Sequence, residues 1–428
     1  MPEFLKLHTP DDARRILLSG IQSTSVGDEV VDATSSLHRV TAEDILAPHP
    51  LPEFARSSVD GFALRAQDTY GAGDSAPAYL RLIGEVRMGA APAFRVASGE
   101  CSLIHTGGMV PQGADAVVML ENTQAVAPRS GASDVMGPSP VDGEIEVLKP
   151  TAVGENVIAA GEDVRQGDVV VRRGVRIRPP EMGGLMALGI MAVRVVRQPK
   201  VGVISSGDEV VDPHLRPAPG QVRDVNAHAL ASLVSEHGGS AVLYGIVPDD
   251  RTAVLNVATR AADECDMVLI SGGSSASARD TTADVIQRLG PPGVLVHGIN
   301  IRPGKPTIFG FGQGKAIIGL PGNPVSAVVI GLLFVAPALQ QILGLPVDQP
   351  VATVRARLTV NLSSQAGRED WWPVRLLPPA EAGREWAADP IFGKSNLIFS
   401  LAAASGLLRI PPEANGLAAG EIAEVRPL

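Results

Sequence analysis

Between residues 199 and 345, short apolar runs alternate with amphipathic segments of helical period. The apolar runs are of strand length and cover residues 200–205, 241–247, 267–271, 294–299 and 316–320. Residues 226–237 and 250–262 have helical spacing, and the first of these segments stops at Gly238-Gly239. This alternation predicts a mostly parallel, doubly wound sheet covered by helices on both faces, that is, a three-layer α/β domain.

The regions before and after this domain have a different pattern. Short alternating strands are predicted at residues 80–86, 100–105, 116–120 and 145–148, between one helix starting at Thr9-Pro10 and another starting near Pro179-Pro180. Alternation returns after Val351 and predicts a small barrel-like β domain. We therefore predict an α/β and β multidomain protein: an N-terminal linker domain of residues 1–60 plus 152–198, a β-rich insertion of 61–151, the α/β domain of 199–345 and a C-terminal β domain of 350–428.

Composition narrows the functional classes. The 428 residues carry a formal net charge of −10, which argues against a nucleic-acid surface because such a surface needs a basic face. Only Cys101 and Cys265 are present, so a disulfide framework or a structural zinc site is not expected. The N-terminus has no signal-peptide pattern, and the uncharged stretch 327–339 is too short to span a bilayer. We expect a cytoplasmic protein without a membrane segment.

The segment Lys315–Ala327, KAIIGLPGNPVSA, combines a buried strand with the start of a helix. Asn323 suits the N-cap and Pro324 the first helical position. Unpaired amides and the positive end of the helix dipole can then bind a phosphate or another oxyanion. From these residues alone, an anion site and a plain strand-to-helix connection are both open.

Three further loops follow strands of the predicted sheet, at the edge where such folds bind ligands. They contain Ser206-Gly207-Asp208-Glu209, then Asp249-Asp250, then Ser271-Gly272-Gly273 followed by Arg279-Asp280. Carboxylates there suit a hard cation such as Mg²⁺, although each also suits a helix cap or a solvated turn. Arg302 and Lys305 flank a stiff Pro-Gly turn and suit phosphate or a tetrahedral oxoanion.

Several common catalytic patterns are absent. The chain has no Walker A loop, no GxGxxG fingerprint, no GxSxG elbow and no paired-histidine metal motif. Instead, a series of motifs runs along nearly the whole chain: RSSVDGFA from Arg56, HTGG from His105, PQGADAVV from Pro111, GED from Gly161, SGDE from Ser206, SGG from Ser271, PGKP from Pro303 and GLPGNPVSA from Gly319. In this order they resemble the molybdopterin molybdenumtransferase family, which includes the E domain of gephyrin.

The resemblance implies an elongated homodimer in which residues 1–60 plus 152–198 form the linker and dimerisation domain and the α/β domain binds a pterin carrying an adenylate. It implies a transferase that inserts molybdate into adenylylated molybdopterin with Mg²⁺ and releases AMP and the molybdenum cofactor. It also suggests transient contact with a molybdopterin adenylyltransferase or with apo-molybdoenzymes. A non-catalytic molybdopterin-binding or scaffold dimer and a related molybdopterin adenylyltransferase are the alternatives.

Site residues follow by position from the same resemblance. The catalytic set is Asp60, Thr106, Asp163, Glu209, Asp249 and Asp280, of which the last three are the metal ligands. The first three are expected to act across the dimer interface. The substrate-binding set is Ser206, Gly207, Ser271, Gly272, Gly273, Arg302, Lys305, Pro321, Gly322, Asn323, Pro324, Ser326, Arg368 and Ser395. The chain departs from the family pattern at Ser277, at Thr281 and at Arg302, where lysine is common.

Overall fold

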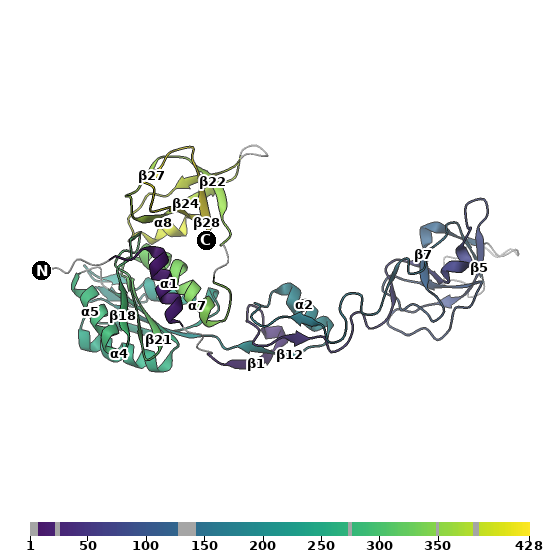
Figure 1. Cartoon of the computed structure of the whole chain (residues 1–428), viewed down its shortest axis with the longest axis horizontal. Coiled ribbons are helices and arrows are strands. Elements are labelled where there is room, and N and C mark those ends of the chain that lie inside the picture. The colour runs from purple at the N-terminus through teal and green to yellow at the C-terminus, as the bar shows by residue number, and fades with distance from the viewer. Residues whose placement is uncertain (1–6, 22–25, 127–142, 273–275, 348–350, 380–384) are drawn as a thin grey trace.

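The computed structural model describes residues 7–21, 26–126, 143–272, 276–347, 351–379 and 385–428, with the side chains of 276–280 outside that description. The chain is elongated (Figure 1). The α/β domain and the C-terminal domain lie together at one end, a small unit with β1, β12 and α2 lies in the middle, and the β-rich domain with β5 and β7 lies at the other end.

The α/β domain contains a six-stranded sheet. In spatial order the strands are β16 (Ser240–Val247), β13 (Lys200–Ser206), β17 (Met267–Gly272), β21 (Lys315–Pro321), β20 (Ile308–Gly312) and β18 (Gly293–His297). The first four are parallel, while β20 and β18 are antiparallel to their neighbours. Strands β13, β17 and β21 are nearly continuous apolar runs because both faces of the sheet are covered.

Helices cover both faces of this sheet, which confirms the predicted three-layer, doubly wound arrangement. One face packs against α3 (Asn226–Glu236), α6 (Pro324–Ile330) and α7 (Ala336–Ile342), and the other against α4 (Arg251–Glu264) and α5 (Ala276–Arg288). Helix α1 (Pro10–Gly20) also belongs to the first face through Ala13 and Leu17. Its packing therefore places it with the α/β domain, although the sequence-based division groups it with the first domain.

Strand β20 is absent from the predicted strands. It is short and contains Gly310 and Gly312, which weaken the strand signal. A Cβ on Gly310 would lie 2.3 Å from Ile286 Cγ2, so close packing of α5 explains that glycine.

A single helical rod, Pro324–Ile342, follows β21 and includes the π-helical turn Gly331–Val335 before Pro337. It is the one helix in the described part of the chain that is long and apolar enough to cross a membrane. However, 78% of its most apolar window is buried inside the protein. The predicted assignment of 327–339 to a buried helix is thus confirmed, and the helix extends beyond that stretch at both ends.

The two units before the α/β domain have their own cores. The middle unit pairs β1 (Asp28–Asp32) with β12 (Ala192–Val196) and β2 (Ile45–Leu46) with β11 (Val169–Val171), beside α2 (Pro179–Ala187). The β-rich domain has one sheet in the order β7 (Ala116–Met119), β4 (Gly61–Leu64), β6 (Glu100–Ile104), β5 (Ala78–Glu85), β9 (Gly143–Val147) and β8 (Thr123–Val126). Strands β3 (Arg56–Ser57) and β10 (Val157–Ile158) pair in the connection between the two units.

The C-terminal domain is a closed five-stranded barrel, as predicted. Its strands are β24 (Glu369–Leu377), β25 (Trp386–Pro390), β22 (Val354–Leu358), β28 (Ile422–Pro427) and β26 (Gly406–Ile410), and β26 pairs back onto β24. The short strand β19 (Ile301–Arg302) of the α/β domain pairs with the start of β24. This pairing joins the two domains next to the carboxyl edge of the α/β sheet.

Candidate functional site

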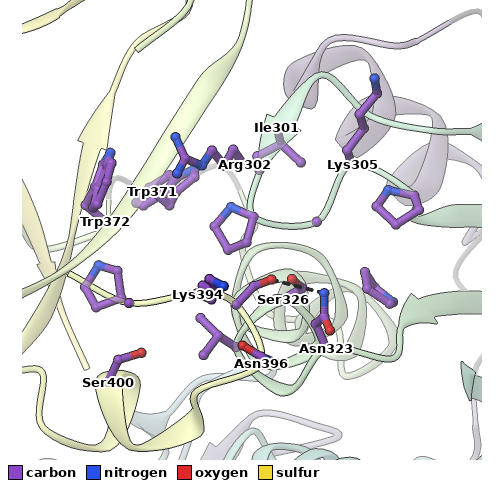
Figure 2. Close-up of a pocket in the computed structure, with 18 of the residues that line it drawn as sticks. Ile301, Arg302, Lys305, Asn323, Ser326, Trp371, Trp372, Lys394, Asn396 and Ser400 are labelled. Atoms are coloured by element: carbon purple, nitrogen blue, oxygen red, sulfur yellow. Dashed lines mark hydrogen bonds between the residues drawn. The ribbon is translucent and has the colours of Figure 1, made fainter. Parts of the chain in front are cut away.

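A cleft of about 640 Å³ lies between the α/β domain and the barrel (Figure 2). We call it the interdomain cleft. Its polar and aromatic lining comes from Arg302, Lys305, Asn323, Ser326, Arg368, Trp371, Trp372, Lys394, Ser395, Asn396 and Ser400. Four of these side chains are cationic, and none of the described lining residues is acidic, so the cleft suits an anion.

Two of the cationic residues share one buried carboxylate. Arg368 donates to Asp370 in a fork, with Nε–Oδ1 at 2.6 Å and Nη2–Oδ2 at 3.0 Å. Arg302 also approaches this carboxylate, with Nη1 3.8 Å from Asp370 Oδ2. Asp370 is fully buried. Lys305 and Lys394 pair with no carboxylate in the described part of the chain, so Asp370 offsets one of the four positive charges and the cleft keeps a net positive charge.

The start of α6 contacts the C-terminal domain. Asn323 occupies the N-cap position and Pro324 the first helical position, as predicted. The Asn323 side chain does not cap the helix but donates from Nδ2 to Ser395 Oγ at 3.1 Å, and the Val325 amide donates to the Ser395 carbonyl at 3.0 Å. The helix start is therefore more than a plain connection, because it holds the Ser395 segment against the cleft and presents Ser326 to it.

A second cavity of about 570 Å³ lies at the carboxyl edge of the sheet, and we call it the sheet-edge pocket. Its polar lining is Ser205, Ser206, Glu209, Arg223, Asp224, Asn226, Ser271, Asn323 and Asn396. Asn323 and Asn396 line both cavities, so the two adjoin. One extended ligand can therefore occupy both.

The acidic loops beside this pocket are ordered by local hydrogen bonds. Ser206 Oγ donates to Asp249 Oδ1 at 2.6 Å, and the Asp249 amide donates to Asp208 Oδ1 at 3.2 Å. Gly207 has φ +156°, and a Cβ there would lie 2.9 Å from Glu209 Oε2. The glycine thus allows the Glu209 carboxylate to pack against the loop.

Two of the three expected metal ligands, Glu209 and Asp249, have described side chains, and both are exposed. Asp280 lies inside α5 rather than in an open loop, and its side chain is outside the described part; Gly273 is also outside it. No group of three His, Cys, Asp or Glu side chains within the described residues is placed to hold a metal ion. Two carboxylates still suit Mg²⁺, which proteins commonly bind through one or two carboxylates together with substrate phosphates.

Asn226 is a pocket residue that the sequence analysis missed. Its side chain is 8% exposed and donates from Nδ2 to Ser271 Oγ at 2.7 Å and to the Gly322 carbonyl at 2.9 Å. It thereby ties the loops after β17 and β21 together. The sequence offers only a weak indication of this role, because asparagine is common at the start of a helix and Asn226 is the first residue of α3.

The N-terminal candidates lie elsewhere in the chain. Asp60 accepts hydrogen bonds from the amide of Thr106 at 2.8 Å and from its hydroxyl at 3.3 Å. The hydrogen bond from the Thr106 amide is the main reason why the pKa of Asp60 lies below its usual 3.8, and His105 contributes a smaller effect. Asp163 is exposed, and its amide donates to the Leu51 carbonyl. Asp60 and Thr106 flank β4 and β6 in the β-rich domain, which lies at the opposite end of the molecule from the α/β domain and the barrel (Figure 1). Asp163 follows β10 in the connection between the β-rich domain and the middle unit.

The structure therefore sorts the predicted site residues into three places. The interdomain cleft contains Arg302, Lys305, Pro321, Asn323, Ser326, Arg368 and Ser395, and the sheet-edge pocket contains Ser206, Glu209, Ser271, Gly322, Asn323 and Pro324. Gly207, Gly272 and Asp249 belong to the same edge loops. The polar and aromatic cleft residues that the sequence analysis left out of its site are Trp371, Trp372, Lys394, Asn396 and Ser400. The adjacent tryptophan pair was the available signal, since the chain has only three tryptophans.

Comparison with known proteins identifies the class of protein that this fold and site define. The model for the MoeA N-terminal region, domains I and II, matches residues 8–189. The probable molybdopterin binding domain matches 202–341, and the MoeA C-terminal region, domain IV, matches 355–428. The central α/β domain is thus of the molybdopterin-binding type, flanked by the two regions that mark a multidomain protein of molybdenum cofactor biosynthesis.

The similarity to individual proteins extends over almost the full length. Molybdopterin molybdenumtransferase 2 of Mycobacterium tuberculosis is 32% identical over 91% of this chain and 92% of its own length. Molybdopterin molybdenumtransferase of Bacillus subtilis is 30% identical over 93% and 89%. The crystal structure of a molybdopterin biosynthesis MoeA protein from Pyrococcus horikoshii is 36% identical over 99% of both chains, with a TM-score of 0.79. The chain belongs to the molybdopterin molybdenumtransferase family and is a transferase.

Proposed function

We propose that this transferase inserts molybdate into adenylylated molybdopterin in the presence of Mg²⁺ and releases AMP and the molybdenum cofactor. One observation carries the proposal: a cleft lined by four cationic side chains adjoins a pocket lined by hydroxyl, amide and carboxylate groups. The first suits a tetrahedral dianion and the second a pterin phosphate joined to a nucleotide.

The interdomain cleft is the proposed molybdate site. Arg302, Lys305, Arg368 and Lys394 supply positive charge, and the hydroxyl groups of Ser326 and Ser395 lie on the same lining. Arginine offers several donors in a fixed plane and lysine a mobile point charge, so together they can neutralise and orient an oxyanion. The partly enclosed position strengthens these interactions relative to open water.

The sheet-edge pocket is the proposed site for the adenylylated pterin. Glu209 and Asp249 would hold Mg²⁺ together with substrate phosphates, and Asp280 remains the third predicted ligand. A bound Mg²⁺ would neutralise the negative charge of the phosphate bridge between pterin and AMP. The residues of this pocket orient the bridge, and Asn323 and Asn396 lie where it would reach the oxyanion cleft.

The test is direct. Purified protein is incubated with adenylylated molybdopterin, molybdate and Mg²⁺, and AMP is quantified by chromatography. We expect AMP release that requires both molybdate and Mg²⁺, and its loss in Arg302→Ala. The matched control is Arg81→Ala, a change at an exposed arginine of the β-rich domain, which should keep full activity. Absence of molybdate-dependent AMP release by the wild-type protein would refute the proposal.

We further propose that the active enzyme is a homodimer whose sites are shared. Asp60 and Thr106 lie in the β-rich domain and Asp163 in its connection, all outside the two domains that form the cleft, so we infer that they complete the cleft of a second copy. The carboxylates of Asp60 and Asp163 also complement the cationic cleft. The buried, unpaired state of Cys101 and Cys265 accords with a reducing cytoplasm, where we expect the protein to act.

Mixing two inactive variants tests the shared site. Asp60→Asn and Arg302→Ala each damage a different half of it, so a mixed dimer would contain one intact site and regain activity after subunit exchange. Sedimentation analysis should show a dimer for both variants. A dimer that regains no activity would show that each site is built from one chain.

A further inference from the structure

Trp372 and Arg302 are brought together by the strand pairing that joins the two domains. Arg302 on β19 is in register with Asp370 on β24. Residues two apart on a strand lie on the same face, so Trp372 follows Asp370 on the side that meets Arg302. The Arg302 Cζ atom lies 5.1 Å from the centroid of the Trp372 ring, within cation–π range. Figure 2 shows both side chains at the barrel side of the cleft.

The two arginines of the cleft are restrained to different degrees. Arg368 makes two short hydrogen bonds to Asp370, and its side chain is 23% exposed. Arg302 is 52% exposed and lies 3.8 Å from the same carboxylate, beyond hydrogen-bond distance. An arginine held this loosely would lose much side-chain freedom on binding an anion. Besides the distant carboxylate, the indole ring of Trp372 is the contact that restrains the Arg302 guanidinium.

The indole itself is held by ring contacts. Trp372 Nε1 is buried and donates no hydrogen bond within the described residues. The ring packs edge-on against Phe392, with centroids 5.7 Å apart and an interplanar angle of 71°. A buried N–H without a partner is unfavourable, so packing alone would favour phenylalanine or leucine at this position. The broad indole face against Arg302 is a feature that leucine does not supply and that phenylalanine supplies over a smaller area.

We propose that Trp372 is a positioning residue for oxyanion binding. Its face holds the Arg302 guanidinium in the cleft before the anion arrives, so that binding orders one side chain fewer. This inference rests on the proposed function, which places molybdate in the interdomain cleft. It adds a role to the barrel domain: Arg368, just before β24, lines the cleft directly, and Trp372 on β24 sets the position of Arg302 from the neighbouring domain.

Three variants test the role. Trp372→Leu removes the aromatic face and keeps an apolar side chain, Trp372→Phe retains an aromatic face, and Trp386→Leu is the control because Trp386 is 41% exposed in the same domain and does not line the cleft. Equilibrium dialysis against molybdate gives the affinity of each variant. We expect binding to weaken about three- to tenfold in Trp372→Leu and less than about twofold in Trp372→Phe and in the control.

A second measurement separates positioning from general damage. The affinity for adenylylated molybdopterin in the absence of molybdate should be unchanged in Trp372→Leu, because the sheet-edge pocket does not include this residue. If Trp372→Leu fails to fold, Trp372→Met replaces it, since a flexible methionine fills irregular space. If folded Trp372→Leu or Trp372→Met binds molybdate as tightly as the wild-type protein, the role of Trp372 is refuted while the proposed oxyanion site stands. Failure of the wild-type protein to bind molybdate would overturn the proposed oxyanion site as well.

Discussion

Replacing Asp370 by asparagine should destabilise the C-terminal barrel and loosen the oxyanion cleft together. The carboxylate is fully buried and accepts two hydrogen bonds from Arg368, at 2.6 and 3.0 Å. Asparagine keeps the shape but removes the charge, which leaves a partly buried guanidinium without its counterion. Breaking a buried pair from one side costs about 3–5 kcal/mol. The Arg368 side chain is 23% exposed, so water can solvate the unpaired guanidinium and reduce this cost. We therefore expect the free energy of unfolding to fall by about 2–4 kcal/mol.

The assay follows from the distribution of tryptophans. All three lie in the barrel, at positions 371 and 372 in β24 and 386 in β25. Urea unfolding followed by tryptophan fluorescence therefore reports the stability of this domain in the full chain. The control is Glu385→Gln, which removes the partner of Arg357 in the same domain. Both members of that pair are substantially exposed, so the expected loss is below about 1 kcal/mol.

A double-mutant cycle sharpens the test. Arg368→Met alone leaves the Asp370 carboxylate buried with its nearest partner gone, and it should also be strongly destabilising. The double variant Arg368→Met/Asp370→Asn removes both charges and should lose less than the sum of the two single changes. A loss in Asp370→Asn no larger than that of Glu385→Gln, or strict additivity in the cycle, would refute the role of this carboxylate as the shared counterion.

Three other predictions address the remaining parts of the site. Gly207→Ala places a Cβ 2.8 Å from Val210 Cγ2 and 2.9 Å from Glu209 Oε2, so both side chains must move, and the Mg²⁺ concentration for half-maximal AMP release should rise about tenfold. Asn226→Ala removes two buried hydrogen bonds between strand-end loops and should cost about 1–3 kcal/mol, measured as faster hydrogen exchange in β17 and β21. Thr106→Val removes the hydroxyl donor but not the amide donor of Asp60, so the pKa of Asp60, measured by NMR titration, should rise only part of the way to 3.8. The favourable interaction with this carboxylate is complete above pH 3.8 and is lost as the pH falls through the lowered pKa of Asp60.

Two of these predictions have a matched control. Gly183→Ala in α2 adds a Cβ to open space and should leave the Mg²⁺ dependence unchanged. For Asn226→Ala, exchange in β5 and β6 of the distant β-rich domain should not change. An unaltered Mg²⁺ dependence in Gly207→Ala, unaltered exchange in Asn226→Ala or a pKa of Asp60 that reaches its ordinary value in Thr106→Val would contradict the corresponding argument.

Elements whose burial leaves a local pattern in the sequence could be predicted, and elements shaped by distant packing could not. The strands VGVIS, MVLIS and AIIGL were predictable because a parallel sheet covered on both faces requires unbroken apolar runs. That their following loops meet at one edge follows from the parallel direction of the strands, so Ser206, Ser271 and Asn323 could be grouped in advance. Strand β20 was not predicted because Gly310 packs against α5 and Gly312 against Leu289 just after it, and local strand propensity does not register such packing.

By itself, the sequence determined the kinds of domain, their order and most of the residues at the sheet edge, because periodicity and turn residues record local structure and burial. Only the tertiary structure decided that α1 packs on the α/β domain, that β19 joins the barrel and that Trp372 lies over Arg302. It also showed that the expected oxyanion-binding turn is one wall of a cleft whose other wall comes from β24 and the Ser395 segment. Contacts between segments far apart in the chain depend on which surfaces fit together, and no local pattern of hydrophobic and polar residues encodes that fit.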